Sequence, residues 1–387
     1  MNKRKIMFLI VIMFTASLMV SCIGAMELNE YGIVTMVGHD KIDDEILLTM
    51  EIVNPVGKKE IMNPEKAIIT QTKGSTIFEA IRNITLFFDR KLYFPHTKVF
   101  VFCDEVAKDG ISKYLDFWQR DYEIRLNSYV LVCIEGNASE LFGTPPASED
   151  LLGDYVEYLI NNTKYSGKSL KVNLRELAKQ YYSEGSNVYV TGVIKKEAKT
   201  STPGFRLNVE GMAVFIKDKL AGYLDGEETK GYNIIKNNIK SALIVAPSGD
   251  DLRFYTIKIL NSKAKSSVKL KEEKWEINID VKMETLMNEI MTDERLRDVK
   301  VIDKIEKATE EVVKSNLESL IERAQNEFKA DIFHFNEYVY RNDYENWNKV
   351  KGKWDEVFCN ASVKVNVDVD VDRDALLEES FLKEEVE

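Results

Sequence analysis

Apolar and polar positions from about Glu27 to Glu197 follow two different periods, which predicts an α+β region. The β-rich runs Ile33–Val37 and Leu47–Val53 flank a short polar segment, as expected for an antiparallel pair. Two continuous apolar runs, Val99–Cys103 and Tyr129–Ile134, are typical of central strands. The region is therefore expected to contain a sheet with these two runs at its centre.

Helices are expected in the same region, one around residues 111–118 and one after Gly74-Ser75-Thr76. Thr76, with Glu79 three residues later, matches a capping box, in which both side chains satisfy backbone N–H groups at the start of a helix. Behind this cap the apolar residues fall on one helical face: Ile77, Ala80, Ile81, Ile84 and Phe88.

Two changes in composition divide the rest of the chain. The polar run 200–204 has no large apolar side chain, and we expect a linker there. A hairpin over Leu207–Ile216 and Leu220–Leu224 and a polar helix from about Glu228 follow, and a weaker boundary lies at 247–250. The predicted fold class is α+β, with three mixed domains, largely antiparallel sheets and amphipathic helices. Their predicted limits are 22–197, 205–248 and 252–380.

The third predicted domain combines strands with the longest helix of the chain. Strands are expected at Phe254–Leu260, Ser267–Leu270 and Trp275–Val281, and an antiparallel-looking terminal strand is expected where valine alternates with polar residues from Val363 to Val371. Apolar residues of the helix recur every three to five positions: Ile302, Ile305, Val312, Leu317, Leu320, Ala324 and Phe328. A face of this kind either docks a partner or covers the domain's own sheet, and the second is the commoner case.

Two segments resemble ligand-binding motifs, but each lacks a glycine that the geometry of its motif requires. Asp368, Asp370, Asp372 and Glu379 have the spacing of an EF-hand calcium loop, but Arg373 stands where that loop needs glycine. Gly167-Lys168-Ser169 resembles the end of a phosphate-binding loop, but Asn162 replaces its first glycine. We therefore predict no metal and no nucleotide cofactor, and we interpret the aspartates as the solvent-exposed face of a strand.

The first 22 residues have the pattern of an exported lipoprotein. A basic start precedes an apolar run from Ile6 to Val20, which is shorter than the roughly 20 residues of a membrane-spanning helix. Ser21-Cys22 then resembles a lipoprotein processing site, so we predict a signal peptide over 1–21 and acylation of Cys22. The alternatives are an uncleaved anchor and ordinary cleavage after Ala25.

Charge and cysteine usage narrow the function classes further. Removal of residues 1–21 reduces the 53 basic residues to 50 against 64 acidic ones, a net charge of −14, which argues against nucleic acid as a partner. Cys103, Cys133 and Cys359 are widely spaced and are interpreted as buried thiols, with a Cys103–Cys133 bridge as the alternative. Without another membrane-binding feature, the lipid on Cys22 is the expected attachment.

Catalytic motifs are not evident in the sequence. The three histidines, His39, His96 and His334, are too far apart for a local metal motif, and neither H-E-x-x-H nor G-x-S-x-G occurs. We expect His39 and His334 at the surface or in turns. No residue is predicted to be catalytic, and the protein is not expected to be an enzyme.

Several ordered blocks of residues resemble the Ger(x)C lipoproteins, the C subunits of spore germination receptors. In the first region these are Glu27-Leu28-Asn29 after Cys22, residues 76–82, residues 90–94 with His96 and Lys98, and Arg120-Asp121 with 123–125. Further along they are residues 211–219, Leu220, Gly222 and Leu224, then Glu227, Glu228 and Gly231, and finally residues 338–341, Trp347 and Trp354. Ile23-Gly24 departs from the Trp-Asp that commonly follows the lipid cysteine in this family.

The resemblance implies a three-domain α+β protein, lipid-anchored to the outer face of the inner spore membrane. It implies a structural or coupling role beside a multispanning A subunit and a transporter-like B subunit, in a complex that senses nutrients and starts germination. No chemistry of its own is implied for the C subunit.

A docking surface is predicted at Arg90, Lys91, Tyr93, Phe94 and His96, where aromatic and cationic residues cluster beside a proline. The alternative is that Tyr93 and Phe94 cap the core while Arg90 pairs with Asp89 or another acid.

Two other function classes remain open at this stage. A solute-binding lipoprotein that delivers a nutrient to a permease fits the size and anchor, but it needs two lobes built from strand-helix-strand units, which the pattern does not favour. A secreted hydrolase would need a catalytic constellation that the sequence does not display.

Overall fold

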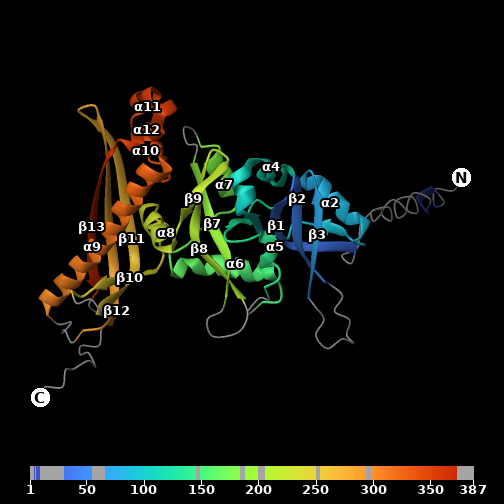
Figure 1. Cartoon of the computed structure of the whole chain (residues 1–387), viewed down its shortest axis with the longest axis horizontal. Helices are drawn as coiled ribbons and strands as arrows, with labels where there is room; N and C mark the ends of the chain where they lie inside the picture. The colour runs from blue at the N-terminus through green and yellow to red at the C-terminus, as the bar shows by residue number, and fades with distance from the viewer. Residues whose placement is uncertain are drawn as a thin grey trace, which may run out of the picture.

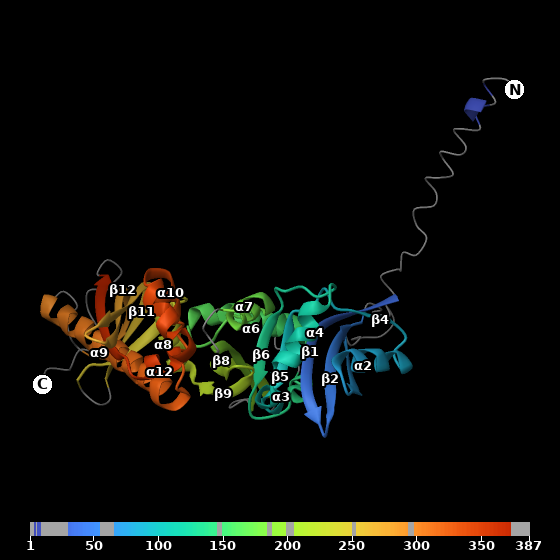
Figure 2. The same ribbon diagram turned by 90° about the horizontal axis from the view of Figure 1, so that it is seen from above.

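The computed structural model describes residues 30–54, 66–144, 149–183, 188–198, 205–249, 253–292 and 298–372, together with Arg4 and residues 6–8. The predicted acylation site at Cys22 and almost all of the predicted signal peptide lie outside these residues. The described chain forms an elongated body with two separate sheets, which Figures 1 and 2 show from two directions. The start of β1 lies at one end of the body, and α9 lies toward the other.

The larger sheet has nine strands, in the order β3-β2-β1-β5-β6-β7-β8-β9, with β4 paired to β1. Its first five strands are β1 (Tyr31–Ile42), β2 (Glu45–Val53), β3 (Ala67–Gly74), β4 (Lys91–Tyr93) and β5 (Val99–Cys103). The other four are β6 (Tyr129–Cys133), β7 (Val188–Ala198), β8 (Phe205–Ile216) and β9 (Lys219–Leu224).

The centre of this sheet is parallel and its flanks are antiparallel. Strands β1, β5, β6 and β7 pair in parallel, whereas β1 with β2, β2 with β3, β7 with β8 and β8 with β9 are antiparallel. All five residues of β5 are buried, which confirms the prediction that the continuous apolar runs are central strands.

Short helices cover the larger sheet. They are α2 (Ile77–Asn83), α3 (Asp104–Asp109), α4 (Ser112–Arg120), α5 (Ala138–Leu141), α6 (Leu152–Asn162) and α7 (Leu174–Tyr181), with 3₁₀ turns η3 (Ile84–Leu86) and η4 (Thr163–Tyr165). The predicted cap of α2 is present, because the Glu79 backbone N–H donates to Thr76 Oγ1 at 3.1 Å. The Glu79 carboxylate, however, accepts from the backbone N–H of Ser75 instead of closing on Thr76.

The larger sheet continues across the predicted linker. Strand β7 ends at Ala198, β8 begins at Phe205, and the two pair antiparallel, so the predicted hairpin β8–β9 belongs to the same sheet as the strands before it. Residues 199–204 themselves lie outside the described residues. The division into domains at 197–205 and 248–252 stays a prediction.

The smaller sheet has four strands in the order β10-β11-β12-β13: β10 (Ala242–Pro247), β11 (Phe254–Lys271), β12 (Lys274–Ile290) and β13 (Ser362–Asp372). The strands expected separately at 254–260 and 267–270 are one strand, with a register shift between Ile259 and Asn261. The valine strand β13 is half-buried as predicted, but its pairing was predicted wrongly. It runs parallel to β12, because the helical segment between them returns the chain to the same end of the sheet.

The long helix is α9 (Val299–Arg323), which continues into a π-helical turn at Ala324–Phe328. Its buried face lies against β10, β13 and α8 (Gly226–Ile235), so its core-packing role is confirmed. In the middle of this helix the buried valine is Val313 and not the expected Val312.

Three short helices complete the C-terminal region: α10 (Asn336–Asn342), α11 (Tyr344–Val350) and α12 (Trp354–Cys359), with a short 3₁₀ turn at Lys351–Lys353. The α+β class with mixed sheets is confirmed.

Candidate docking surface and the helix that joins the two sheets

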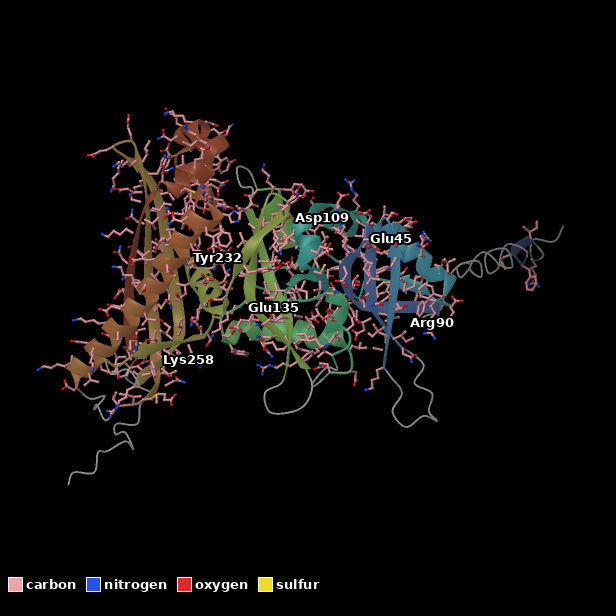
Figure 3. The ribbon with its side chains drawn as sticks, in the orientation of Figure 1. Glu45, Arg90, Asp109, Glu135, Tyr232 and Lys258 are labelled. Carbon is pink, nitrogen blue, oxygen red and sulfur yellow. The ribbon has the colours of Figure 1, made fainter. Side chains whose placement is uncertain are left out.

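The predicted docking residues lie on and beside the short edge strand β4. Lys91, Leu92 and Tyr93 pair in parallel with Tyr31, Gly32 and Ile33 at the start of β1. The Lys91 ammonium lies 3.5 Å from the Glu123 carboxylate and over the Tyr31 ring, and the Tyr93 ring lies between the rings of Tyr31 and His96. Figure 3 places Arg90 at the end of the molecule where the described chain begins.

Burial separates the five predicted residues into two groups. Phe94 is 4% exposed and packs against the Trp118 ring at 5.5 Å between centroids, so it has the core-capping role given above as the alternative. Lys91 and His96 are exposed, and Arg90 and Tyr93 are half-buried. A partner can therefore reach four of the five side chains, and docking at these four stays a prediction.

His39 is fully buried, so the prediction that it lies at the surface or in a turn is wrong. It stands in the middle of β1, where Trp118 Nε1–H donates to its Nε2 at 2.8 Å and its Nδ1 lies 3.0 Å from the Val101 carbonyl. Because an indole can only donate, Nε2 must accept and Nδ1 must carry the proton. Burial lowers the pKa of His39 to about 3, and the neutral ring acts as a bridge between β1, β5 and α4.

His334 is also buried, but it lies in a turn, as one of the two predicted alternatives had it: its backbone N–H donates to the Asp331 carbonyl at 3.3 Å. It has a left-handed backbone with φ of 55°, and neither ring nitrogen has a hydrogen-bond partner among the described residues. Burial, with a smaller contribution from the nearby Lys236, lowers its pKa to about 4. Neither histidine has an exposed ring available for proton transfer with a substrate.

Buried carboxylates that could be mistaken for a catalytic pair hold helices onto the larger sheet. Asp40 on β1 accepts the backbone N–H groups of Ala138 and Ser139, at 2.6 and 2.8 Å, at the start of α5. Glu51 on β2 accepts those of Leu152 and Gly153, also at 2.6 and 2.8 Å, at the start of α6. These distant carboxylates satisfy N–H groups that the first turn of a helix leaves without partners.

The cysteines of the two central strands are free thiols. Cys103 and Cys133 are in register on β5 and β6, so the proximity that a bridge would need is present, yet both are unpaired. Burial raises the pKa of each thiol to about 12, which disfavours the reactive thiolate. The interpretation as buried thiols is confirmed for these two, whereas Cys359 is a free thiol that is only half-buried.

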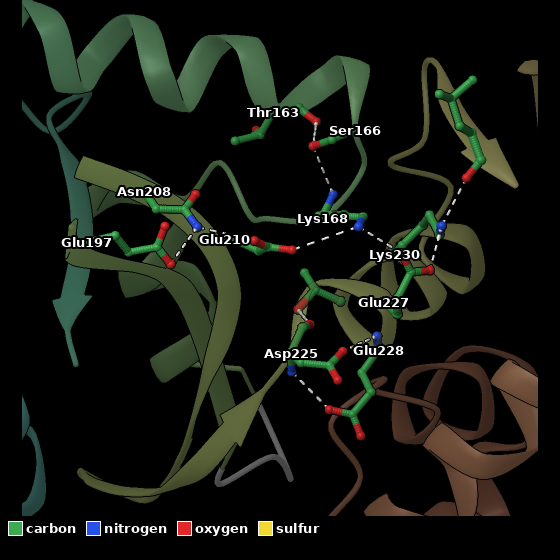
Figure 4. A network of polar contacts seen from close by, with 12 residues as sticks. Thr163, Ser166, Lys168, Glu197, Asn208, Glu210, Asp225, Glu227, Glu228 and Lys230 are labelled. Atoms are coloured by element: carbon green, nitrogen blue, oxygen red, sulfur yellow. Dashed lines mark hydrogen bonds and ion pairs between the residues drawn. The ribbon is translucent and has the colours of Figure 1, made fainter. Parts of the chain in front are cut away.

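Helix α8 joins the two sheets through polar contacts on several sides, part of which Figure 4 shows. On the side of the larger sheet, Lys168 lies 2.9 Å from Glu227 and 3.9 Å from Glu210 of β8. Lys230 pairs with Glu227 at 2.6 Å and donates to the Leu243 carbonyl of β10. Asp225 caps the helix, in a reciprocal capping box with Glu228.

The same helix also contacts elements that belong only to the C-terminal region. Arg323 of α9 makes two hydrogen bonds to Glu228, at 2.7 and 2.6 Å. Asn237, just after the helix, donates to the Ala264 carbonyl and accepts the Ala264 N–H, while Lys236 donates to the Phe333 carbonyl. Asn233 donates to the carbonyls of Gly167 and Ser169 in the other direction. Helix α8 and the residues next to it therefore contact both sheets, the segment 167–169 on one side and α9 on the other.

The sequence predicted α8 as a polar helix, and only its contacts show what the polar residues do. Gly226 and every residue from Thr229 to Ile235 are buried. The Cβ of any larger residue at 231 would lie within 3.2 Å of Leu320 on α9, so glycine here permits close helix packing. The sequence predicted only a polar helix here and gave no indication that it joins the two sheets.

Metal-ligand clusters and membrane spans were also sought in the described part of the chain. No group of three or more His, Cys, Asp or Glu side chains there is placed to hold a metal ion. No helix of the same residues is both long enough and apolar enough to cross a bilayer.

Comparison with known proteins gives two family matches that together cover both regions. The family described as "Spore germination protein N-terminal domain" matches residues 24–196, and "Spore germination B3/GerAC like, C-terminal" matches residues 210–374. The crystal structure of the GerBC protein superposes with a TM-score of 0.58 at 20% identity, over 87% of this chain and 96% of that one.

Relatives from Bacillus subtilis (strain 168) match over most of their length. Spore germination protein KC is 23% identical over 92% of this chain and 92% of its own. Spore germination protein B3 is 25% identical over 80% of each chain, and spore germination protein A3 is 25% identical over 94% of this chain and 96% of its own. Two family matches in the correct order, a shared fold and relatives of similar length agree, and the chain belongs to the Ger(x)C family of spore germination proteins.

Proposed function

We propose that this protein is the lipid-anchored subunit of a nutrient germinant receptor in spores. It is held through acylated Cys22 on the outer face of the inner spore membrane and is a structural and coupling partner of membrane-embedded A and B subunits. The observation that carries the proposal is the pair of family matches, which covers residues 24–196 and 210–374. The short apolar run before Cys22 supports the lipid anchor.

The contacts of α8 support a coupling role rather than a catalytic one. A helix whose residues contact both sheets transmits a displacement of one region to the other, because its neighbours on both sides are fixed by hydrogen bonds. The buried carboxylates and histidines found here have structural positions, and the exposed docking residues lie at the opposite end of the larger sheet from α8. This arrangement suits a subunit that links a membrane partner to a second surface.

The experiment that tests the proposal is purification from dormant-spore membranes in mild detergent. Two multispanning proteins are expected at stoichiometric level with the wild-type chain. Cys22→Ala is expected to release the protein from the membrane fraction and to abolish the germination response, because tethering keeps the interface occupied. Cys359→Ala, which removes a half-buried thiol elsewhere, is the matched control and should behave as wild type.

Other recoveries would contradict the proposal. An ATP-driven permease as the partner, or a protein recovered alone with a small molecule bound, would instead indicate a solute-binding lipoprotein. A fully active Cys22→Ala variant without lipid would refute the anchor.

A further inference from the structure

Three large apolar side chains are exposed together near the start of the described chain. Phe78 on α2 is 51% exposed, Leu86 at the end of η3 is 82% exposed and Phe87 directly after it is 62% exposed. Phe78, Arg82 and Leu86 are spaced at four-residue intervals along α2 and its 3₁₀ extension, which places them on one side of this segment. We call Phe78, Leu86 and Phe87 the apolar tip.

The turn that presents the apolar tip is held firmly to the larger sheet. Ile84 is 1% exposed, and its carbonyl accepts the backbone N–H groups of Phe87 and Phe88 at 3.1 and 2.9 Å. Phe88 packs so close to β1 that a Cβ at Gly32 would lie 2.7 Å from its ring. Residues on both sides of Leu86 and Phe87 are thus fixed, and the two side chains stay exposed on a rigid turn.

The tip lies close to the start of β1. Leu86 precedes Lys91 by five residues, and Lys91 pairs with Tyr31, so Leu86 and Phe87 lie within about 17 Å of this pair even on a fully extended chain. Eight residues separate Tyr31 from Cys22, which limits the distance from β1 to the lipid attachment to about 30 Å. In Figures 1 and 2, α2 lies at the end of the molecule where β1 begins.

We propose that the apolar tip enters the interfacial layer of the lipid bilayer beside the acylated cysteine. This inference rests on the proposed function, because it requires the anchor at Cys22. Aromatic and aliphatic side chains partition into this layer, and lipidated proteins commonly need a second membrane contact to fix their orientation. Together with the lipid, the tip gives the domain two attachment points and so sets the direction in which α8 and the second sheet project.

The charged residues around the tip are compatible with a membrane contact, but they do not provide the main attraction to the bilayer. The Arg82 guanidinium stacks on Phe78 at 4.9 Å from the ring centre, and it can extend to lipid phosphates while its stem stays on apolar surface. Lys73 and Lys91 are exposed nearby, but so are Glu79 and Asp89. Apolar contact therefore carries the interaction, and we expect it to persist at high salt.

The test uses the full-length, lipidated protein in vesicles of phosphatidylcholine and phosphatidylglycerol. All four native tryptophans are buried, at 9% exposure or less, so their emission should not respond to the vesicles, and the fluorescence that Phe87→Trp adds to the wild-type signal reports on the tip. Its fluorescence should shift to the blue on reconstitution and should be quenched at least twofold by lipids brominated on the acyl chains. Tyr344→Trp, at a 60% exposed position on α11, is the control and should show neither change.

The outcomes separate this inference from the proposed function. A protein that does not float with the vesicles would refute the anchor itself. A Phe87→Trp variant that floats but whose added fluorescence is unquenched would overturn the apolar tip as a lipid contact while leaving the anchor intact. A blue shift that occurs only after addition of the A and B subunits would assign the tip to a protein partner instead. Leu86→Trp repeats the measurement if the first variant folds poorly.

Discussion

Two helices on the larger sheet and the long helix of the C-terminal region begin at caps of different kinds. In the N-terminal region, α5 and α6 begin against Asp40 and Glu51, carboxylates on β1 and β2 that lie 98 to 102 residues away in sequence. In the C-terminal region, α9 begins at its own neighbour Asp298, which accepts the Lys300 N–H. Helices α5 and α6 are therefore capped by buried carboxylates from distant strands, whereas α9 is capped by a residue directly before it.

The two regions also differ in the length of their strands and helices. The C-terminal region is built from an 18-residue strand, a 17-residue strand and a 25-residue helix, whereas the central strands β5 and β6 have five residues each. Long elements bury a continuous apolar face and need few specific contacts to fix their register. Short elements bury less per element, so their placement depends more on individual side chains. Loss of one polar group should therefore cost more in the N-terminal region.

The largest expected effect is that of Glu51→Ala. The variant leaves the Leu152 and Gly153 N–H groups buried and without their acceptor, while the Thr35 hydroxyl loses the carboxylate and keeps only its 3.4 Å contact with the backbone carbonyl of residue 51. We expect a loss of about 3 kcal/mol or more in the free energy of unfolding. Asp298→Ala, the exposed cap of α9, should cost about 1 kcal/mol. Urea unfolding followed by hydrogen exchange in each region measures both values.

Glu51→Gln is the matched control for the Glu51→Ala variant. It keeps the side-chain length and one acceptor oxygen, so its loss should fall between wild type and Glu51→Ala. If Glu51→Ala and Asp298→Ala lowered the free energy of unfolding by the same amount, the buried cap would be no more stabilising than the exposed one. The contrast between the regions would then disappear.

The same contrast explains what could be predicted from the sequence. Periodicity revealed α9, the valine strand β13 and the central strands β5 and β6, because each pattern is contained within one element. The Thr76 cap of α2 was equally local. The parallel direction of β13 was not predictable in this way, since it depends on where the chain returns after α12 and not on any residue of the strand.

The roles of the buried polar residues were harder to predict from the sequence. His39 was misplaced because its partner Trp118 lies 79 residues away, and only the folded sheet brings the two rings together. Asp40 was assigned to a polar segment between two strands, yet it is the last buried carboxylate of β1 and caps a distant helix. Helix α8 was predicted only as a polar helix, because its partners Lys168 and Arg323 lie far from it in the sequence, one before it and one after it. Long-range polar pairing leaves no periodic signal.

Acidification should also separate the two regions. The folded-state pKa of His39, about 3, lies below its ordinary value of 6.5, so the unfolded state binds more protons between these pH values. Stability of the N-terminal region therefore falls as pH drops below 6.5, by about 2 kcal/mol at pH 5. Hydrogen exchange of β5 amides at pH 7 and pH 5, corrected for intrinsic rates, measures the loss.

The C-terminal region contains two groups that oppose each other over the same range. His334, with a pKa of about 4, also loses stability on acidification. Asp331 is buried, which raises its pKa from 3.8 to about 6, so the folded state holds its proton more tightly and gains stability between these values. The net loss for β12 amides at pH 5 should stay below about 1 kcal/mol. Equal losses in β5 and β12 would contradict the assignment, and His39→Gln should flatten the response of β5 alone.

The smallest effects are expected for two ion pairs, one between α8 and α9, where the two regions meet, and one between two strands of the smaller sheet. The Arg323–Glu228 pair links α9 to α8 with side chains 29% and 25% exposed, whereas Lys282–Asp368 links β12 to β13 with side chains 78% and 68% exposed. We expect Arg323→Met to cost about 1 kcal/mol and Lys282→Met less than about 0.5 kcal/mol, because solvent screens the exposed pair. Arg323 also donates to Glu327 at 2.7 and 2.9 Å, so Glu327→Gln is the control that shows how much of the cost belongs to that local pair. Methionine keeps the apolar stem in both variants, so the difference reports on charge.

Salt dependence sharpens that comparison, because the two pairs differ in screening as well as in size. Between about 0.05 M and 1 M NaCl the cost of Lys282→Met should vanish, while most of the cost of Arg323→Met should remain, since a half-buried bidentate pair is screened much less. The urea midpoint at both salt concentrations measures this. If the cost of Arg323→Met also vanished at high salt, the junction would be held by packing around Gly231 and Leu320 rather than by charge, and α8 would couple the regions through shape alone.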